Sequence, residues 1–160
     1  MVATYHRDMP EILEPTTHLG MPAWGFAFPG PLRDRLTALA LDGTKVATAG
    51  LAVDYVVEGG LPPRPGDREV MLDSDGRPVA IVEITRVDLS TIRLVDDDFA
   101  RAEGEGFADA ADWREAHERF WNGYIDELRT GLRDPSFELS DSTVVVCEWF
   151  RIVERLGDPA

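Results

Sequence analysis

Residues 41–50 read Leu-Asp-Gly-Thr-Lys-Val-Ala-Thr-Ala-Gly, which places a helix stop, a lysine and a threonine close together. Leucines recur at helical spacing just before this stretch, so we expect a helix over about residues 31–42 that ends at Gly43. A threonine hydroxyl is a poor nucleophile unless a base lies within hydrogen-bond reach, and a desolvated lysine is such a base. Lys45 and Thr48 are therefore either a base and a nucleophile or, in the ordinary case, a solvated lysine and a strand threonine.

The rest of the chain shows strand and helix patterns in turn. Strands are expected over residues 46–53, 69–73, 78–87 and 143–153. The Asp-Gly pair at residues 75–76 predicts a hairpin turn, because a tight turn needs a positive φ. A short helix is expected from the acidic residues 96–98, and a longer one over about residues 109–129. This order predicts a mixed α/β or α+β domain on a curved sheet, preceded by an N-terminal arm over residues 1–23, and we favour the α+β class.

The acidic composition limits the partners. The 160 residues carry a formal net charge of −14, which repels nucleic acid at long range. We therefore expect no duplex DNA partner, whereas a nucleoside or a short single strand needs only a local pocket. We also expect no membrane partner, because no apolar run reaches the ~20 residues of a membrane helix. Cys147, the only cysteine, lies in an apolar run, which predicts a buried thiol in a cytoplasmic protein without disulfides.

Several short motifs, in this order along the chain, resemble the ASCH domain (activating-signal-cointegrator homology). They are GTKVAT at 43–48, DY and EG within 54–59, LP and PGD within 61–67, FA and EGEG within 99–106, WREAH and F within 113–120, and CE and F within 147–150. The resemblance implies a small β-barrel of mixed strands, related to the PUA domain. Helices flank this barrel and a cleft lies at one end. The domain would span residues 24–156.

The resemblance also implies several activities. PUA-like domains commonly bind RNA. Short ASCH members hydrolyse N4-acetylcytidine with a lysine, a threonine three residues later and a glutamate on a later strand. Some longer members are described as ribonucleases, with metal assistance as one option, and others have an inferred RNA-binding or coactivator role. Family membership therefore predicts the fold more firmly than the function.

The amidohydrolase pattern falls on Lys45, Thr48 and Glu83. Thr48 would attack the amide carbonyl or orient a water, Lys45 would be the base, and Glu83 would contact the base ring or protonate the leaving amine. Lys45 must then lie in the turn before the strand, because residues three apart on a straight strand face opposite sides. Glu83 is an acid within an apolar strand, where a carboxylate must be paired or face a cavity. A structural pair with Arg68, Arg86 or Lys45 explains Glu83 about as well.

Five other residues are candidates for substrate binding. Backbone N–H groups near Thr44 would stabilise an oxyanion, and Tyr55 would stack on a base. Arg64 and Arg68 flank a Pro-Gly-Asp loop and would contact ribose or phosphate. His117 would act at the edge of the cleft. The ordinary alternatives are a core tyrosine, solvated loop arginines and a packed histidine.

An acidic run at residues 96–98, with Glu103 and Glu105, raises the question of a metal. The run lacks the spacing of a calcium loop, and a solvated charge run is the ordinary interpretation. Together with His117, it is where a divalent ion such as manganese would bind in a ribonuclease. We otherwise expect no metal and no cofactor.

These observations favour an amidohydrolase that acts on an N4-acylated cytidine. One alternative is a single-stranded RNA-binding protein or metal-assisted ribonuclease, and another is a non-catalytic binding module. The expected partner is a nucleoside or a short single-stranded RNA, and the expected assembly is a monomer or a small homo-oligomer.

Overall fold

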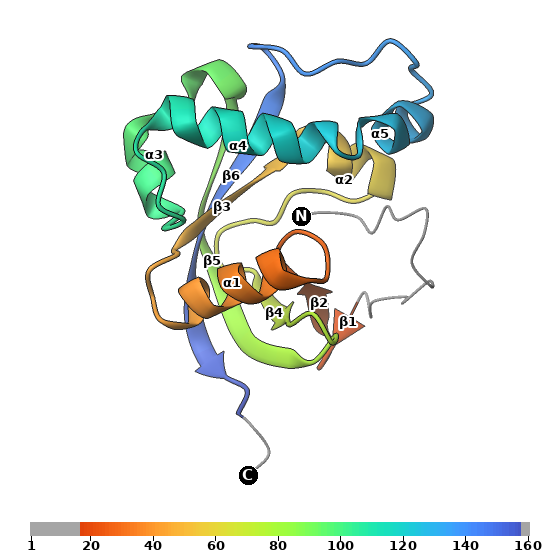
Figure 1. The fold of residues 1–160 in the computed structure, drawn as a ribbon. Coiled ribbons are helices and arrows are strands. Elements are labelled where there is room, and N and C mark those ends of the chain that lie inside the picture. The colour runs from red at the N-terminus through yellow and green to blue at the C-terminus, as the bar shows by residue number, and fades with distance from the viewer. Residues whose placement is uncertain (1–16, 158–160) are drawn as a thin grey trace.

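A computed structural model describes residues 17–157 of the chain (Figure 1). The elements in this part are β1 (Thr17–His18), β2 (Met21–Trp24), α1 (Pro31–Leu41), β3 (Ala47–Leu51), α2 (Ala52–Glu58), β4 (Arg68–Leu72), β5 (Pro78–Thr91), the 3-10 helix η1 (Ile92–Leu94), α3 (Asp97–Ala102), α4 (Ala110–Asn122), α5 (Ile125–Leu132) and β6 (Val144–Arg155). The mixed α+β class expected from the sequence is confirmed. None of these helices has the length and apolar character of a membrane span.

The six strands form one open sheet in the order β1-β2-β4-β5-β6-β3. Every pair is antiparallel except β2 with β4. A closed barrel was expected, but β1 and β3 lie at opposite ends of this order and do not pair with each other. The register of the long β5–β6 pair shifts between Ile81 and Val82 and again between Ile84 and Arg86. Such irregularities bend strands, so the sheet is curved without being closed.

Local signals predicted several elements well. The first helix ends at Leu41 and is followed by Gly43 with φ 84°, as its glycine stop requires. The hairpin between β4 and β5 turns at Gly76 with φ 75°. Of the predicted arm, residues 1–16 lie outside the described residues, while residues 17–23 contribute β1 and most of β2.

Two elements differ from expectation. The single helix expected over residues 109–129 is two helices, because the chain leaves helical geometry at Tyr124. The Tyr124 hydroxyl donates to Asp54 Oδ2 at 2.9 Å, which ties this break to the buried Asp54 of α2. The expected strand over residues 46–53 stops at Leu51 and continues as α2, whose seven residues gave no clear helical signal.

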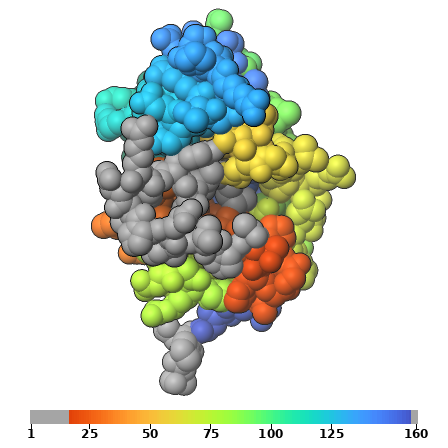
Figure 2. Space-filling model, turned by 90° about the vertical axis from the view of Figure 1, so that its right-hand side faces the viewer, coloured from red at the N-terminus to blue at the C-terminus, as the bar shows by residue number. Residues whose placement is uncertain are grey.

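The helices pack on the sheet through two apolar clusters. One cluster joins α2, α3, α4 and α5 to β3 and one end of β6, with Trp113, Trp121 and Leu128 at its centre. The other joins α1 to the middle of the sheet around Leu36 and Phe150. The side view in Figure 2 shows α5 in blue against α2 in yellow. Side chains of both clusters border the pocket described next.

Candidate functional site

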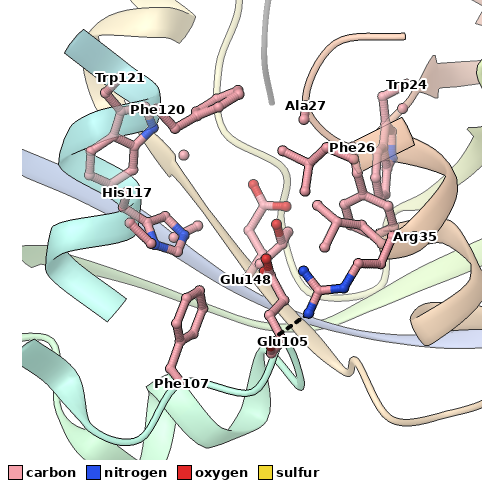
Figure 3. A pocket seen from close by; sticks show the side chains of 17 residues that line it. Trp24, Phe26, Ala27, Arg35, Glu105, Phe107, His117, Phe120, Trp121 and Glu148 are labelled. Atoms are coloured by element: carbon pink, nitrogen blue, oxygen red, sulfur yellow. Dashed lines mark hydrogen bonds between the residues drawn. The ribbon is translucent and has the colours of Figure 1, made fainter. Parts of the chain in front are cut away.

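A pocket of about 210 Å³ opens between α1, α4 and β3 (Figure 3). Its walls are largely aromatic, and two carboxylates and two basic side chains also line it. The lining residues are Trp24, Gly25, Phe26, Ala27, Leu32, Arg35, Leu36, Thr48, Ala49, Gly50, Glu105, Phe107, Ala116, His117, Phe120, Trp121 and Glu148. Flat aromatic walls with a few polar groups are typical of a site for a planar ligand.

Lys45 lies in the turn between α1 and β3 and is buried. Its Nζ donates to Glu105 Oε2 at 2.8 Å and to the Glu103 carbonyl oxygen at 3.4 Å. The same nitrogen lies 5.3 Å from the centre of the Phe26 ring. Lys45 is therefore an enclosed cation next to a pocket carboxylate, and the solvated alternative does not describe it.

Glu103, Gly104 and Glu105, here called the acidic strap, run directly against the turn that carries Lys45. Gly104 has φ +67°, and a Cβ there would lie 2.2 Å from the Thr44 carbonyl oxygen. Only glycine permits this approach, which holds the Glu105 carboxylate beside the ammonium. The two glutamates are separated from Lys45 by about sixty residues of sequence, so no local pattern connects them.

Glu103 and His117 form a second buried pair behind the strap. His117 Nε2 lies 3.1 Å from Glu103 Oε2, its Nδ1 donates to the Trp113 carbonyl oxygen at 2.8 Å, and its ring stacks on the Trp113 ring. Burial opposes the charged form of His117, but the Glu103 carboxylate outweighs it and raises the histidine pKa. Burial likewise acts to raise the pKa of Glu103, but the charges of His117 and Lys45 hold it below its usual value.

Glu105 shows the opposite balance. Burial raises its pKa and the charge of Glu103 adds to the effect, although Lys45 opposes it. A glutamate that readily accepts a proton thus lies 2.8 Å from a lysine ammonium.

The acidic strap and His117 also offer a potential metal-ligand set. Glu103, Glu105 and His117 place one ligand atom each within 4.8 Å of one another. The donor types suit manganese, but the Lys45 ammonium already pairs with Glu105 and the His117 ring already contacts Glu103. A divalent ion would have to displace the ammonium, so the residues fit a metal poorly and we derive no step through one.

The acidic run at residues 96–98 does not join this set. Asp96 caps α3 by accepting from the Phe99 N–H, Asp97 accepts from the Ala110 N–H, and Asp98 pairs with Arg101. These contacts are those of helix caps and an exposed ion pair.

Thr48 and Glu148 share the floor of the pocket. They are directly opposed on the antiparallel strands β3 and β6, so both side chains lie on the same face. Glu148 is 2% exposed, and its Oε1 accepts a hydrogen bond of 2.6 Å from the Tyr55 hydroxyl. Tyr55 therefore lies buried beside Glu148 instead of stacking on a ligand in the pocket.

The structure does not bring Glu83 to the pocket. Glu83 lies on the opposite face of the sheet from Val82 and Ile84, which pack under α1. Its carboxylate pairs with Arg68 at 3.3 Å and with Arg151 at 2.8 Å. The structural pairing with Arg68 that the sequence left open is what the structure shows.

Of the other residues predicted to contact the substrate, one lines the pocket and three do not. His117 lines the pocket, but both of its ring nitrogens are engaged as described above. Thr44, Arg64 and Arg68 are exposed and do not line the pocket. Thr44 N–H instead donates to Asp42 Oδ1 at 2.8 Å.

Sequence reasoning missed Arg33, which holds one wall of the pocket. Arg33 is buried, and its guanidinium donates to the carbonyl oxygens of Phe26 and Ala27, both at 2.9 Å. A Cβ on Gly25 would lie 2.5 Å from Arg33 Cζ, so this loop and the guanidinium fit closely. A buried arginine in α1 is recognisable only once the loop has folded onto it.

A family model and one of two similar crystal structures carry the same family description. A family model described as ASCH domain matches residues 23–154. A crystal structure of an ASCH domain from Lactobacillus crispatus is 32% identical, with a TM-score of 0.71 over 82% of this chain and 79% of that one. A crystal structure of a protein from Enterococcus faecalis is 26% identical, with a TM-score of 0.73 over 87% of this chain and 80% of that one. No curated protein matches.

Proposed function

Because the chain belongs to the ASCH domain family, which is related to RNA binding, we propose that its pocket binds the base of a nucleoside and hydrolyses an acyl amide on that base. The proposed substrate is an N4-acylated cytidine. The observation that carries the proposal is the buried Lys45–Glu105 pair, at 2.8 Å, in which Glu105 lines the same pocket as Thr48.

The proposed chemistry uses Glu105 where the sequence suggested Glu83. In this scheme Lys45 first transfers a proton to Glu105, whose carboxylate oxygen lies 2.8 Å from its Nζ, and then acts as the base. Lys45 then takes the Thr48 hydroxyl proton as Thr48 Oγ forms a bond to the acyl carbon. The bond between that carbon and the base N4 breaks, and N4 receives the proton from Lys45. Water then hydrolyses the threonine ester and releases the carboxylic acid. In an alternative form of this scheme, no ester forms and Thr48 orients a water molecule that attacks the acyl carbon directly.

Pocket shape and charge support a small ligand. Phe26, Phe107 and Phe120 provide flat apolar surface for a base, and Arg35 and His117 are the basic residues of the lining. A polynucleotide needs several cationic contacts to overcome a net charge of −14. A nucleoside needs none of them.

The test is turnover of N4-acetylcytidine by the purified protein. Thr48→Ala and Glu105→Gln should each lower kcat/KM by about 10²–10⁴-fold, because each removes a group that acts on the reacting atoms. Glu83→Gln is the matched control on the opposite face of the sheet and should leave the rate unchanged. Full activity in Thr48→Ala and Glu105→Gln would exclude this mechanism.

A second candidate is single-stranded RNA binding, with or without cleavage. The observation that favours it is an exposed Arg86 guanidinium 4.4 Å from the centre of the Trp149 ring, outside the pocket. Stacked arginine and tryptophan side chains are used to bind unpaired bases. RNA binding that weakens steeply with salt, and is lost in Arg86→Gln, would support this candidate. Manganese-dependent cleavage would then separate a ribonuclease from a binding protein.

A non-catalytic binding module is the remaining alternative. It predicts that acylated cytidine raises the thermal stability of the protein without any cytidine being released. Detection of product would exclude it as the complete function.

A further inference from the structure

We propose that Glu148, held by Tyr55, is a recognition group that selects ligands presenting an N–H donor edge to the floor of the pocket. The base that enters would carry an exocyclic amine or a secondary amide at this point, and a carbonyl oxygen at the same point would be rejected. The identity of the base rests on the proposed function, but recognition is a matter of binding and does not require turnover.

The first support is the position of the carboxylate. Glu148 is 2% exposed, lines the pocket and lies opposite Thr48 in the register of β3 and β6. Figure 3 shows its side chain pointing from the strand into the pocket, between the aromatic wall and Arg35. A ligand that fills the pocket must therefore meet this group.

The second support is the lack of a cation for this carboxylate. Within residues 17–157, Glu148 forms no ion pair, and its hydrogen bond comes from the neutral Tyr55 hydroxyl. The basic groups around the pocket contact other partners: Lys45 pairs with Glu105, His117 lies against Glu103, and Arg35 donates to the Glu105 carbonyl oxygen at 2.8 Å. A buried carboxylate with a single neutral donor is poorly compensated, so N–H donors of a ligand would be bound favourably.

A second buried acid strengthens this preference. Glu69 on β4 is 5% exposed, and its Oε2 has no hydrogen-bond partner within the described part of the chain. Burial raises the pKa of Glu69 to about 7, and the charge of Glu148 adds to the shift. The charge of Glu148 is thus felt by a second buried acid, and a carbonyl oxygen that points at the Glu148 carboxylate would be repelled by the same charge.

Cytidine and uridine differ in whether position 4 of the base carries a hydrogen-bond donor or an acceptor. Cytidine presents an exocyclic N–H at C4, whereas uridine presents a carbonyl oxygen at the same position. An N4-acylated cytidine keeps one N–H on that nitrogen. Glu148 would thus accept the amide N–H of the substrate and then the amine of the product.

The experiment compares the dissociation constants of cytidine and uridine by isothermal titration calorimetry. The wild-type protein should bind cytidine at least about tenfold more tightly, because a site that hydrogen-bonds one edge leaves its polar group unpaired with the other. Glu148→Gln should abolish or reverse this ratio, because the amide N–H₂ donates to the uridine oxygen while its oxygen still accepts from Tyr55. Glu83→Gln, on the opposite face, should keep the wild-type ratio.

Each outcome decides the proposal. Equal binding of both nucleosides to the wild-type protein, no binding of either, or an unchanged ratio in Glu148→Gln would overturn it. Tyr55→Phe keeps the carboxylate but removes the hydrogen bond that holds it in position, so a severalfold smaller ratio in this variant would support the proposal even if Glu148→Gln failed to fold. The hydrolase is judged separately by release of cytidine from N4-acetylcytidine, so turnover without discrimination refutes only the role of Glu148.

Discussion

Two clusters of acids and bases, one on each side of the sheet, use the same chemistry in different surroundings. On the open face, Glu83 bridges Arg68 and Arg151, and the three side chains are 20%, 57% and 63% exposed. Beside the pocket, Glu105 meets Lys45 at 12% and 1% exposure. Distances of 2.8 Å occur in both clusters, so geometry alone does not separate them.

Burial separates them. Water screens the Glu83 cluster, and such pairs contribute little to stability. Beside the pocket, removal of water makes each charge depend on its neighbour, which is why burial and Glu103 raise the pKa of Glu105 while His117 and Lys45 lower that of Glu103. An ion pair therefore indicates a functional site only when the protein has excluded the solvent around it.

The largest expected effect follows from removing the buried cation. Lys45→Met leaves the acidic strap with one cation for two carboxylates, and we expect the free energy of unfolding to fall by about 3–5 kcal/mol. Urea denaturation of the variant and the wild type measures this loss of unfolding free energy. Arg151→Met, on the open face, is the matched variant and should change stability little. A similar loss in both variants would contradict the distinction between the clusters.

The next effect concerns Glu69, a buried carboxylate that forms no ion pair with any residue between 17 and 157. The folded-state pKa of Glu69 is about 7, above its ordinary value of 4.5, so the folded protein binds this proton more tightly than the unfolded chain. Its contribution to stability is complete below pH 4.5 and is lost as the pH rises through 7, a change of about 3 kcal/mol. Glu69→Gln should remove this pH dependence. If the free energy of unfolding of Glu69→Gln changed with pH between 4.5 and 7 as steeply as that of the wild type, this assignment to Glu69 would be wrong.

A smaller effect is expected at His117. Because Glu103 raises its pKa, the pair stabilises the fold fully below the ordinary pKa of about 6.5 and loses that contribution as the pH rises through the folded value. His117→Gln should cost about 2 kcal/mol at pH 6 and less at higher pH. Thermal denaturation across this range measures the difference. In Glu103→Gln, the His117 pKa observed by NMR should fall, which ties the shift to this partner.

The smallest effect is expected on the open face. Glu83→Gln should leave turnover, nucleoside binding and the urea midpoint unchanged, because its partners are exposed arginines that water solvates equally well. Parallel assays of the variant and the wild type test this. A loss of turnover here would return Glu83 to the active site and reverse the comparison.

Sequence patterns located what depends on neighbours in the chain. The end of α1, the hairpin at Gly76 and the place of Lys45 in a turn follow from local backbone preferences. Glu83 and Glu148 illustrate the limit, because both are acids in apolar strands and only the sheet decides which face each one occupies. Whether the sheet closes into a barrel likewise depends on which strands pair, and these strands are distant in the sequence.

Contacts across the fold account for the remaining differences. The partner of Lys45 is separated from it by sixty residues, and the break between α4 and α5 coincides with a bond from Tyr124 to Asp54. Neither leaves a periodic signal. In the sequence Glu105 is one acid of an acidic segment, and its contact with Lys45 follows only from the packing of the acidic strap against the turn at Thr44.

The close passage at Gly104 has a consequence for how this protein can vary. The aromatic walls of the pocket can exchange one flat side chain for another, so ligand preference is open to gradual change. Position 104 is different, since even a methyl group would meet the Thr44 carbonyl oxygen and move Glu105 away from Lys45. In a library of random variants selected for activity, we expect many different residues at the aromatic walls of the pocket and only glycine at position 104.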